Sequence, residues 1–168
     1  MIVVVEGVDN SGKSTLIKAL QVILPGYGLQ GSEGPPKYRG EMDDRVTSYL
    51  RNTDKMIYDR HPCVSQPIYG MMRSHSDPIH PRLLESFYRQ RPLFIYCDGG
   101  DRGMFGHTHN PESGDTQEHL DAVNENYVKL LAAYRVWAGQ HAFISYRIGD
   151  SISRVCKTVE SLVSQGRL

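Results

Sequence analysis

The stretch from Gly7 to Ser14 has the residue types and spacing of a binding site for phosphate groups. It reads Gly-Val-Asp-Asn-Ser-Gly-Lys-Ser and fits the pattern G-x-x-x-x-G-K-[ST] without deviation. The glycines let the backbone wind so that successive N–H groups point inward, toward anionic oxygens. Lys13 adds a positive charge for the β- and γ-phosphates, and the Ser14 hydroxyl is a hard oxygen ligand for Mg²⁺. The predicted ATP phosphate-binding residues are Asp9, Asn10, Ser11, Gly12, Lys13, Ser14 and Thr15.

A second polar pair, Asp59 and Arg60, stands at the end of an expected strand over residues 55–59. A carboxylate that ends a core strand beside the glycine loop lies where the outer ligand shell of a metal must come from. Asp59 therefore joins Ser14 as a predicted Mg²⁺ residue. The alternatives are that Asp59 only caps the following helix and that Arg60 makes only a surface ion pair.

Strands alternate with helices along the chain. Residues 2–5 are β-branched and do not alternate in polarity, which is typical of a strand buried on both faces of a parallel sheet. Further strands are expected at 27–31, 55–59, 92–97 and 142–146, and helices at 13–24, 39–50, within 62–70, and at 79–89, 119–137 and 151–163. The alternation predicts an α/β fold, a three-layer P-loop NTPase sandwich with a parallel sheet flanked by helices and a single domain over residues 1–168.

The composition argues against several classes of protein. The 168 residues carry 19 Lys and Arg against 19 Asp and Glu, and this zero net charge speaks against a nucleic-acid coat or a polybasic membrane anchor. No apolar run approaches the roughly 20 residues that span a bilayer, and the first residues lack the features of a signal peptide. Cys63, Cys97 and Cys156 are far apart and form no C-x-x-C pair. We therefore expect a cytoplasmic protein without disulfide bonds.

Two classes of nucleotide-binding protein fit poorly. The chain has neither the Asn-Lys-x-Asp guanine reader of GTPases nor the Leu-Ser-Gly-Gly-Gln signature of transport ATPases. Residues 98–116 are polar, glycine-rich and without periodicity, and loops of that length often form lids. A small chain with a lid favours a phosphotransferase, since water would otherwise compete with the acceptor.

The two motifs together resemble those of the thymidylate kinase group of nucleoside monophosphate kinases. That group carries E-G-x-D-x-x-G-K-S-T, which residues 6–15 match, and a later Asp-Arg-aromatic motif, which corresponds to residues 59–61. Together with Pro62, Ser65 and Tyr69-Gly70 after it, this version of the motif is similar to that of small kinases of the group encoded by bacteriophages. Residues 101–107 resemble, more weakly, the start of the lid in some thymidylate kinases. The resemblance implies a P-loop kinase that uses ATP and Mg²⁺ to convert a (deoxy)nucleoside monophosphate into the diphosphate.

The resemblance also implies roles for single residues. Asp9 would accept a hydrogen bond from the acceptor sugar, Asp59 would hold the Mg²⁺ shell through water, and Arg60 would contact the acceptor phosphate. Arg39 is a second candidate for the acceptor phosphate, in competition with Arg45. Because members of the group often pair through helices, a homodimer is an open option.

A lid cation is also expected, because phosphoryl transfer depends on positioning and on neutralising charge. Between residues 98 and 128 the only Arg or Lys is Arg102. The alternative is that Arg102 only pairs with a nearby aspartate. Arg89 and Arg91 flank the strand that leads into the lid and are the reserve candidates. The predicted catalytic set is Lys13, Arg60 and Arg102.

The acceptor base is left open: dTMP is one candidate among several, which include dGMP, dUMP derivatives and modified-pyrimidine monophosphates. Thymidylate kinases use a Phe and an Arg on a helix ahead of the Asp-Arg motif to read thymine, whereas the first Phe of this chain is Phe87. Tyr38, Tyr49 and Tyr69 are the aromatic substitutes, and Tyr69 is assigned to the acceptor site. Two alternatives remain: a P-loop kinase that acts on another hydroxyl, in a modified DNA base or a small metabolite, and a nucleotide-binding regulatory module with little turnover.

Overall fold

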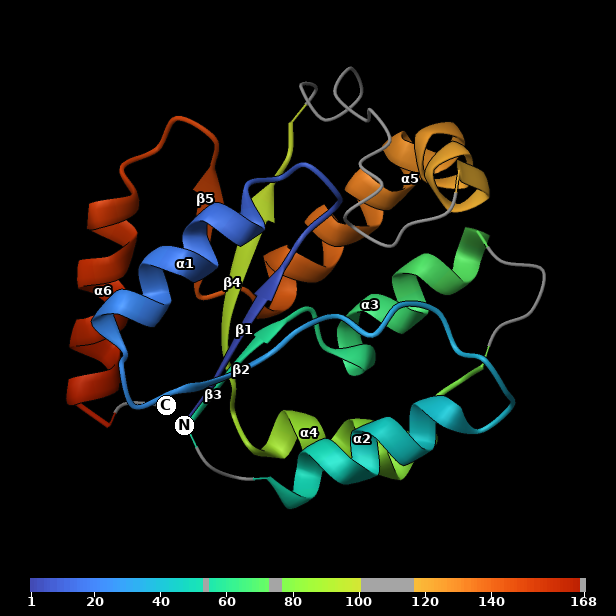
Figure 1. The fold of residues 1–168 in the computed structure, drawn as a ribbon, viewed down its shortest axis with the longest axis horizontal. Helices are drawn as coiled ribbons and strands as arrows, with labels where there is room; N and C mark the ends of the chain where they lie inside the picture. Colours follow the sequence, from blue (N-terminus) through green and yellow to red (C-terminus); the bar gives the residue numbers. More distant parts are fainter. Residues whose placement is uncertain (53–54, 73–76, 101–116, 167–168) are drawn as a thin grey trace.

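A single five-stranded parallel sheet organises the chain in the computed structural model, which describes residues 1–52, 55–72, 77–100 and 117–166 (Figure 1). The strand order is β2-β3-β1-β4-β5. The strands are β1 (Ile2–Glu6), β2 (Gly28–Gln30), β3 (Met56–Asp59), β4 (Leu93–Asp98) and β5 (Ile144–Arg147). The predicted α/β fold with a parallel sheet is confirmed.

Helices cover both faces of this sheet, which gives three layers (Figure 1). One face packs against α1 (Lys13–Ile23) and α6 (Ile152–Ser164). The other packs against α2 (Glu41–Arg51), α3 (Pro62–Tyr69), α4 (Pro81–Arg89) and α5 (Gln117–His141), and a short 3₁₀ turn, η1, spans Gly70–Met72. Every residue of β1 and β4 is buried, as the continuous apolar run at residues 2–5 predicts for central strands.

The helix boundaries differ from the predicted ones where a local cap decides them. Helix α2 begins at Glu41 rather than residue 39, because Gly40 adopts a left-handed φ of 89°. The buried Asp77 carboxylate accepts hydrogen bonds from the N–H groups of Gly40 (2.7 Å) and Met42 (2.9 Å), and so caps this helix from 35 residues away. Helix α4 begins at Pro81 rather than residue 79, after His80 as its N-cap. Helix α5 runs four residues past the expected end at 137, to His141.

The parallel direction of the strands brings distant segments to one edge of the sheet. The glycine loop follows β1, Arg60 follows β3, Gly99 follows β4, and the end of β5 carries Arg147. β1 pairs with β3 on one side, with Val5 opposite Asp59, and with β4 on the other, with Val5 opposite Ile95. In open α/β sheets this carboxyl edge is where ligands bind.

The same topology rules out the two reserve lid cations. Arg89 ends α4 and Arg91 lies just before β4, so both stand at the amino edge of the sheet, opposite the glycine loop. Residues 101–116, which contain Arg102 and most of the predicted lid, lie outside the described residues. In the described part of the chain, no helix is both long and apolar enough to cross a membrane.

Candidate active site

The glycine loop takes a path that only glycine permits at Gly7. Its φ is 146°, and a Cβ there would lie 2.2 Å from the carbonyl oxygen of Cys97 on β4. Gly12, with a φ of 84°, turns the chain into α1 and gives that helix no side-chain cap. The first N–H groups of α1 are therefore left for another acceptor, and helix N-termini of this kind bind phosphate.

Lys13 folds back over the loop that precedes it. Its Nζ donates hydrogen bonds to the carbonyl oxygens of Gly7 (2.9 Å) and Val8 (2.6 Å) and lies 3.4 Å from Ser11 Oγ. Burial, together with the positive charge of Arg60, lowers the pKa of Lys13 from 10.5 to about 8. The ammonium is thus a charged group held in the loop with few partners other than carbonyl dipoles, which phosphate oxygens would satisfy better.

The predicted magnesium residues lie at the two sides of this loop. Ser14 is exposed in the first turn of α1, while Asp59 is half-buried at the end of β3. Hydroxyl and carboxylate oxygens are the hard donors that Mg²⁺ prefers, and in phosphate sites the ion takes its remaining ligands from phosphates and water. The residues present therefore fit the predicted ion.

Asp9, in the glycine loop, forms one cluster with Arg60 and Tyr69. The Arg60 guanidinium makes an ion pair with Asp9 Oδ1 and donates to Tyr69 Oη at 2.8 Å. The Tyr69 hydroxyl donates to Asp9 Oδ2 at 2.9 Å, and the guanidinium carbon lies 5.0 Å from the Tyr69 ring centroid. Three of the four predicted acceptor residues are thus brought together, although they come from separate segments of the sequence.

The charges of this cluster decide what Asp9 can do. Burial alone would raise the pKa of the carboxyl, but the positive charges of Arg60 and Lys13 outweigh burial and hold it well below its usual value. Asp9 is therefore a hydrogen-bond acceptor at neutral pH and a poor general base. Burial also raises the pKa of Tyr69, so its hydroxyl keeps its proton.

The other candidate acceptor arginines are placed differently. Arg45 is buried, and its guanidinium pairs with Glu41 and with Glu33 (3.2 Å) and donates to the carbonyl oxygen of Gly34 at 2.9 Å. These contacts hold the segment between β2 and α2, so Arg45 is structural. Arg39 is exposed in the turn just before α2.

Glu6, the first residue of the 6–15 motif, has contacts that the sequence did not reveal. It is fully buried at the end of β1. Its Oε1 accepts the N–H of His61 at 2.7 Å, and its Oε2 accepts the hydroxyl of Tyr134 on α5 at 3.0 Å. Burial raises the pKa of Glu6 from 4.5 to about 7. The available signal was a carboxylate that ends an otherwise apolar strand.

A second missed cluster lies at the carboxyl end of β4. The buried Asp98 carboxylate accepts hydrogen bonds from Arg135 on α5, two at 3.1 Å, and from Arg147 at the end of β5, at 3.2 Å. The cluster adjoins the glycine loop, because a Cβ on Gly99 would lie 2.9 Å from Val8 Cγ2. Both arginines are partly exposed, so they are cations at the same edge as Lys13.

The buried Glu6 makes a prediction about stability. We expect Glu6→Gln to become more stable relative to the wild type as the pH rises from 4.5 to about 7. Over that interval the folded chain keeps a proton on Glu6 that the unfolded chain has released, so stability present below pH 4.5 is lost toward pH 7. Each pH unit is worth about 1.4 kcal/mol, so the total is about 3 kcal/mol.

Urea denaturation at a series of pH values measures this change as the difference in unfolding free energy between the two chains. Glu85→Gln is the matched control, since Glu85 is exposed and pairs with Arg89 at the far edge of the sheet. A difference between wild type and Glu6→Gln that stays constant from pH 4.5 to 7 would contradict the prediction.

No protein-family model and no curated protein sequence matches this chain. Solved structures do match it. The YorR protein from Bacillus subtilis, solved in complex with phosphorylated GDP, is 18% identical and covers 98% of this chain and 96% of its own, with a TM-score of 0.71.

Two further similar structures are more distant. Deoxyadenosine kinase from M. mycoides with bound dATP is 13% identical, covers 98% of this chain and 100% of its own, and has a TM-score of 0.53. Thymidylate kinase from Candida albicans is 13% identical, covers 99% of this chain and 92% of its own, and also has a TM-score of 0.53. The parallel sheet, the glycine loop after β1 and these likenesses together identify the fold as that of the P-loop kinases.

Proposed function

We propose that the chain is a kinase that uses ATP and Mg²⁺ to convert a (deoxy)nucleoside monophosphate into its diphosphate. One observation carries the proposal: Arg60, at the end of the neighbouring strand β3, and Tyr69 both contact Asp9 of the phosphate loop. An arginine that can hold an acceptor phosphate is thus near enough to the lysine that can hold the donor phosphates for its charge to lower the pKa of that lysine. This is the pairing that transfer between two phosphates requires.

The charge on Asp9 favours a phosphate over a hydroxyl as the acceptor. A phosphate oxygen is already ionised at neutral pH and needs no general base, whereas a hydroxyl benefits from one. Asp9 is poorly suited to be that base, because its carboxylate already accepts from Arg60 and Tyr69 and its pKa is well below the usual value. The acceptor oxygen would attack the γ-phosphorus in line, with Asp9 left to hold the acceptor sugar.

Each remaining residue has a binding task. Lys13 and the N–H groups at the start of α1 would hold the donor phosphates, and Ser14 and Asp59 would hold the ion. Bound Mg²⁺ would supply charge neutralisation for the β- and γ-phosphates. Arg60 would turn part of its guanidinium from Asp9 to the acceptor phosphate. Its Nε is buried and has no hydrogen-bond partner among the described residues, which is a cost that an anionic ligand would reduce.

A screen of acceptors tests this function. The protein is incubated with ATP and Mg²⁺ and with each deoxynucleoside and ribonucleoside monophosphate in turn, and the products are separated by chromatography. We expect ADP and one diphosphate to form in equal amounts with a limited set of monophosphates. ADP formed only with a nucleoside, a small metabolite or DNA would select a hydroxyl kinase instead, and no ADP with any acceptor would favour the regulatory module.

Arg102 is the proposed lid cation, and its replacement makes a further prediction. We expect Arg102→Ala to lower kcat by about 100-fold or more with little change in the KM for either substrate, because the lost charge acts in the transition state. Steady-state kinetics on the best acceptor measures both constants. Arg89→Ala is the control, since that side chain lies at the opposite edge of the sheet. An unchanged kcat would refute the role of Arg102 and direct attention to Arg135 and Arg147.

A further inference from the structure

Glu6 is a buried carboxylate that the proposed chemistry does not use. It is fully inaccessible, and both of its oxygens accept hydrogen bonds, from the His61 N–H (2.7 Å) and from the Tyr134 hydroxyl (3.0 Å). The other four residues of β1 are apolar, and an apolar side chain would suit this position better for stability alone. A carboxylate kept in such a place calls for an explanation beyond packing.

The backbone next to His61 provides the first part of that explanation. Arg60 has a φ of 65°, a left-handed conformation that a long side chain rarely adopts. Two consecutive N–H groups hold this turn against the end of β1: that of Arg60 donates to the Val5 carbonyl oxygen (3.0 Å), and that of His61 donates to Glu6. Strained residues persist only where the surroundings over-determine them, and Glu6 supplies one of the two contacts that do so here.

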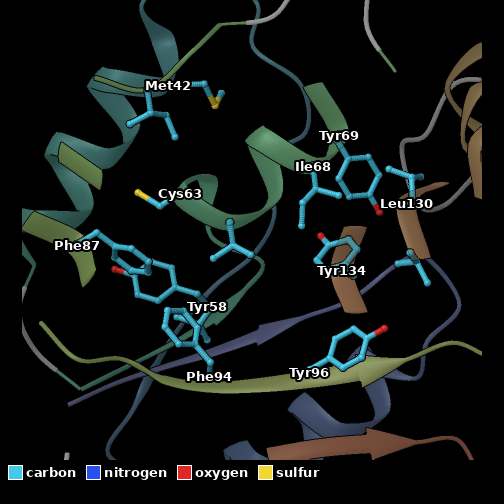
Figure 2. Close-up of a cluster of buried hydrophobic side chains, with 14 of the residues drawn as sticks. Met42, Tyr58, Cys63, Ile68, Tyr69, Phe87, Phe94, Tyr96, Leu130 and Tyr134 are labelled. Atoms are coloured by element: carbon cyan, nitrogen blue, oxygen red, sulfur yellow. The ribbon is translucent and has the colours of Figure 1, made fainter. Parts of the chain in front are cut away.

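The second carboxylate oxygen of Glu6 adds a contact with α5, through the hydroxyl of Tyr134. The Tyr134 ring packs edge-on against the Tyr69 ring, with centroids 6.1 Å apart, and Figure 2 shows the two side chains next to one another above the sheet. The Tyr69 hydroxyl donates to Asp9, and Asp9 pairs with Arg60. The contacts therefore form a closed ring that returns to Glu6. Its members are Glu6, Tyr134, Tyr69, Asp9, Arg60 and His61.

We propose that Glu6 is a positioning residue, which holds the Arg60–His61 turn and α5 to the end of β1 and thereby aims the Arg60 guanidinium at the phosphate loop. The inference rests on the proposed function for its kinetic meaning. Its structural part, that the hydrogen bond from the His61 N–H to Glu6 fixes this turn, can be tested without measuring activity. Since α5 is the helix that follows the lid, the same carboxylate also ties that helix to the Arg60 turn.

Three variants of the full-length protein separate positioning from packing. Glu6→Ala removes both hydrogen bonds, whereas Glu6→Gln keeps an oxygen for the His61 N–H and an amide for the Tyr134 hydroxyl. We expect Glu6→Ala to lower kcat by about 100-fold, the effect of a small misplacement of a catalytic group, with KM for ATP changed by less than about threefold. Glu6→Gln should restore kcat to within about fivefold of the wild type.

Tyr134→Phe is the third variant, and it removes only the contact with α5. We expect it to lower kcat by about tenfold while the His61 N–H stays protected. Because its phenyl ring still packs against Tyr69, this variant keeps the inference testable if Glu6→Ala does not fold.

A double variant gives the sharpest test. If Glu6 acts through Arg60, the kcat of the double variant Glu6→Ala/Arg60→Ala should lie within about threefold of the kcat of Arg60→Ala alone. If the two residues act independently, the two losses of kcat would multiply. Hydrogen exchange supplies a readout without activity: the amide of His61 should exchange faster in Glu6→Ala and remain protected in Glu6→Gln. Multiplying effects, or a Glu6→Ala protein with normal kcat and a protected His61 amide, would overturn the inference. Failure of the proposed function is distinct, because the wild type itself would then form no diphosphate.

Discussion

Replacing Lys13 with alanine is expected to reduce phosphoryl transfer by about 1000-fold or more. The Lys13 ammonium lies against the loop carbonyls, at 2.6 Å from Val8 O and 2.9 Å from Gly7 O. Phosphoryl transfer has little covalent chemistry for the protein to perform, so the loss of a positioned charge on the β- and γ-phosphates removes a large part of the rate acceleration. The measurement is kcat, from ADP release in the presence of the acceptor that the screen identifies.

We expect Lys13→Ala to be as stable as the wild type even though it loses activity. Burial holds the Lys13 pKa at about 8 rather than 10.5, so the charged side chain costs about 3 kcal/mol of folding free energy at neutral pH. Its hydrogen bonds offset part of that cost, and alanine removes both terms. We therefore expect a melting temperature no lower than that of the wild type, as is common where a buried charge serves function.

Lys18→Ala is the matched control for Lys13→Ala, because Lys18 is exposed on the same helix. It should keep kcat within about twofold of the wild type, as expected for a surface change. Undiminished turnover in Lys13→Ala would contradict the phosphate site itself. Lost activity together with a large drop in melting temperature would instead indicate a folding defect, which the buried charge does not predict.

Local patterns carried the predictions that succeeded. The glycine loop was recognisable because its residues are contiguous, and the order of strands and helices followed from hydrophobic periodicity. The resemblance assigned Asp9 and Arg60 to the acceptor, and Tyr69 was chosen separately as an aromatic substitute; the structure shows the three side chains in contact. Their roles in catalysis remain predictions.

Contacts between distant segments could not be predicted from the sequence. The Tyr134 hydroxyl bonds to Glu6 across 128 positions, and Arg147 reaches Asp98 across 49. Periodicity assigns such residues to a helix or a strand but gives no partner for them. Arg89 and Arg91 were proposed from their nearness to the lid in sequence, which says nothing about which edge of the sheet they occupy. The parallel direction of β4 places them at the wrong one.

The buried centre of the site is hard to predict for a further physical reason. Glu6, Asp9, Lys13 and Arg60 bring four ionisable groups into one small, largely buried region, an arrangement that hydrophobic burial alone would not produce. The charges of Asp9 and Arg60 compensate one another there, and the two partners lie on different segments. A sequence pattern describes one element at a time, so the strained and charged centre of a site is the part it describes least well.

Replacing Arg60 is the second change with a large expected effect. We expect Arg60→Ala to lower kcat/KM for the acceptor by about 1000-fold, with KM for ATP changed by less than about threefold, because the guanidinium would contact the acceptor phosphate and the transferred group. Arg60→Lys should recover little of this activity. A lysine offers a point charge and cannot bind an oxygen pair as a planar guanidinium does. Initial rates over a range of acceptor concentrations measure the effect.

Arg60→Gly separates the side chain from the backbone at the same position. Glycine loses the guanidinium as alanine does, but it accepts the φ of 65° without strain. The two variants should therefore be equally inactive, while Arg60→Gly is more stable than Arg60→Ala by about 1 kcal/mol. Arg89→Ala, which removes an exposed arginine from the opposite edge, should behave as the wild type. If Arg60→Ala kept its kcat/KM for the acceptor, Arg60 would serve only to hold Asp9, and the acceptor phosphate would need another partner, for which exposed Arg39 is the remaining candidate.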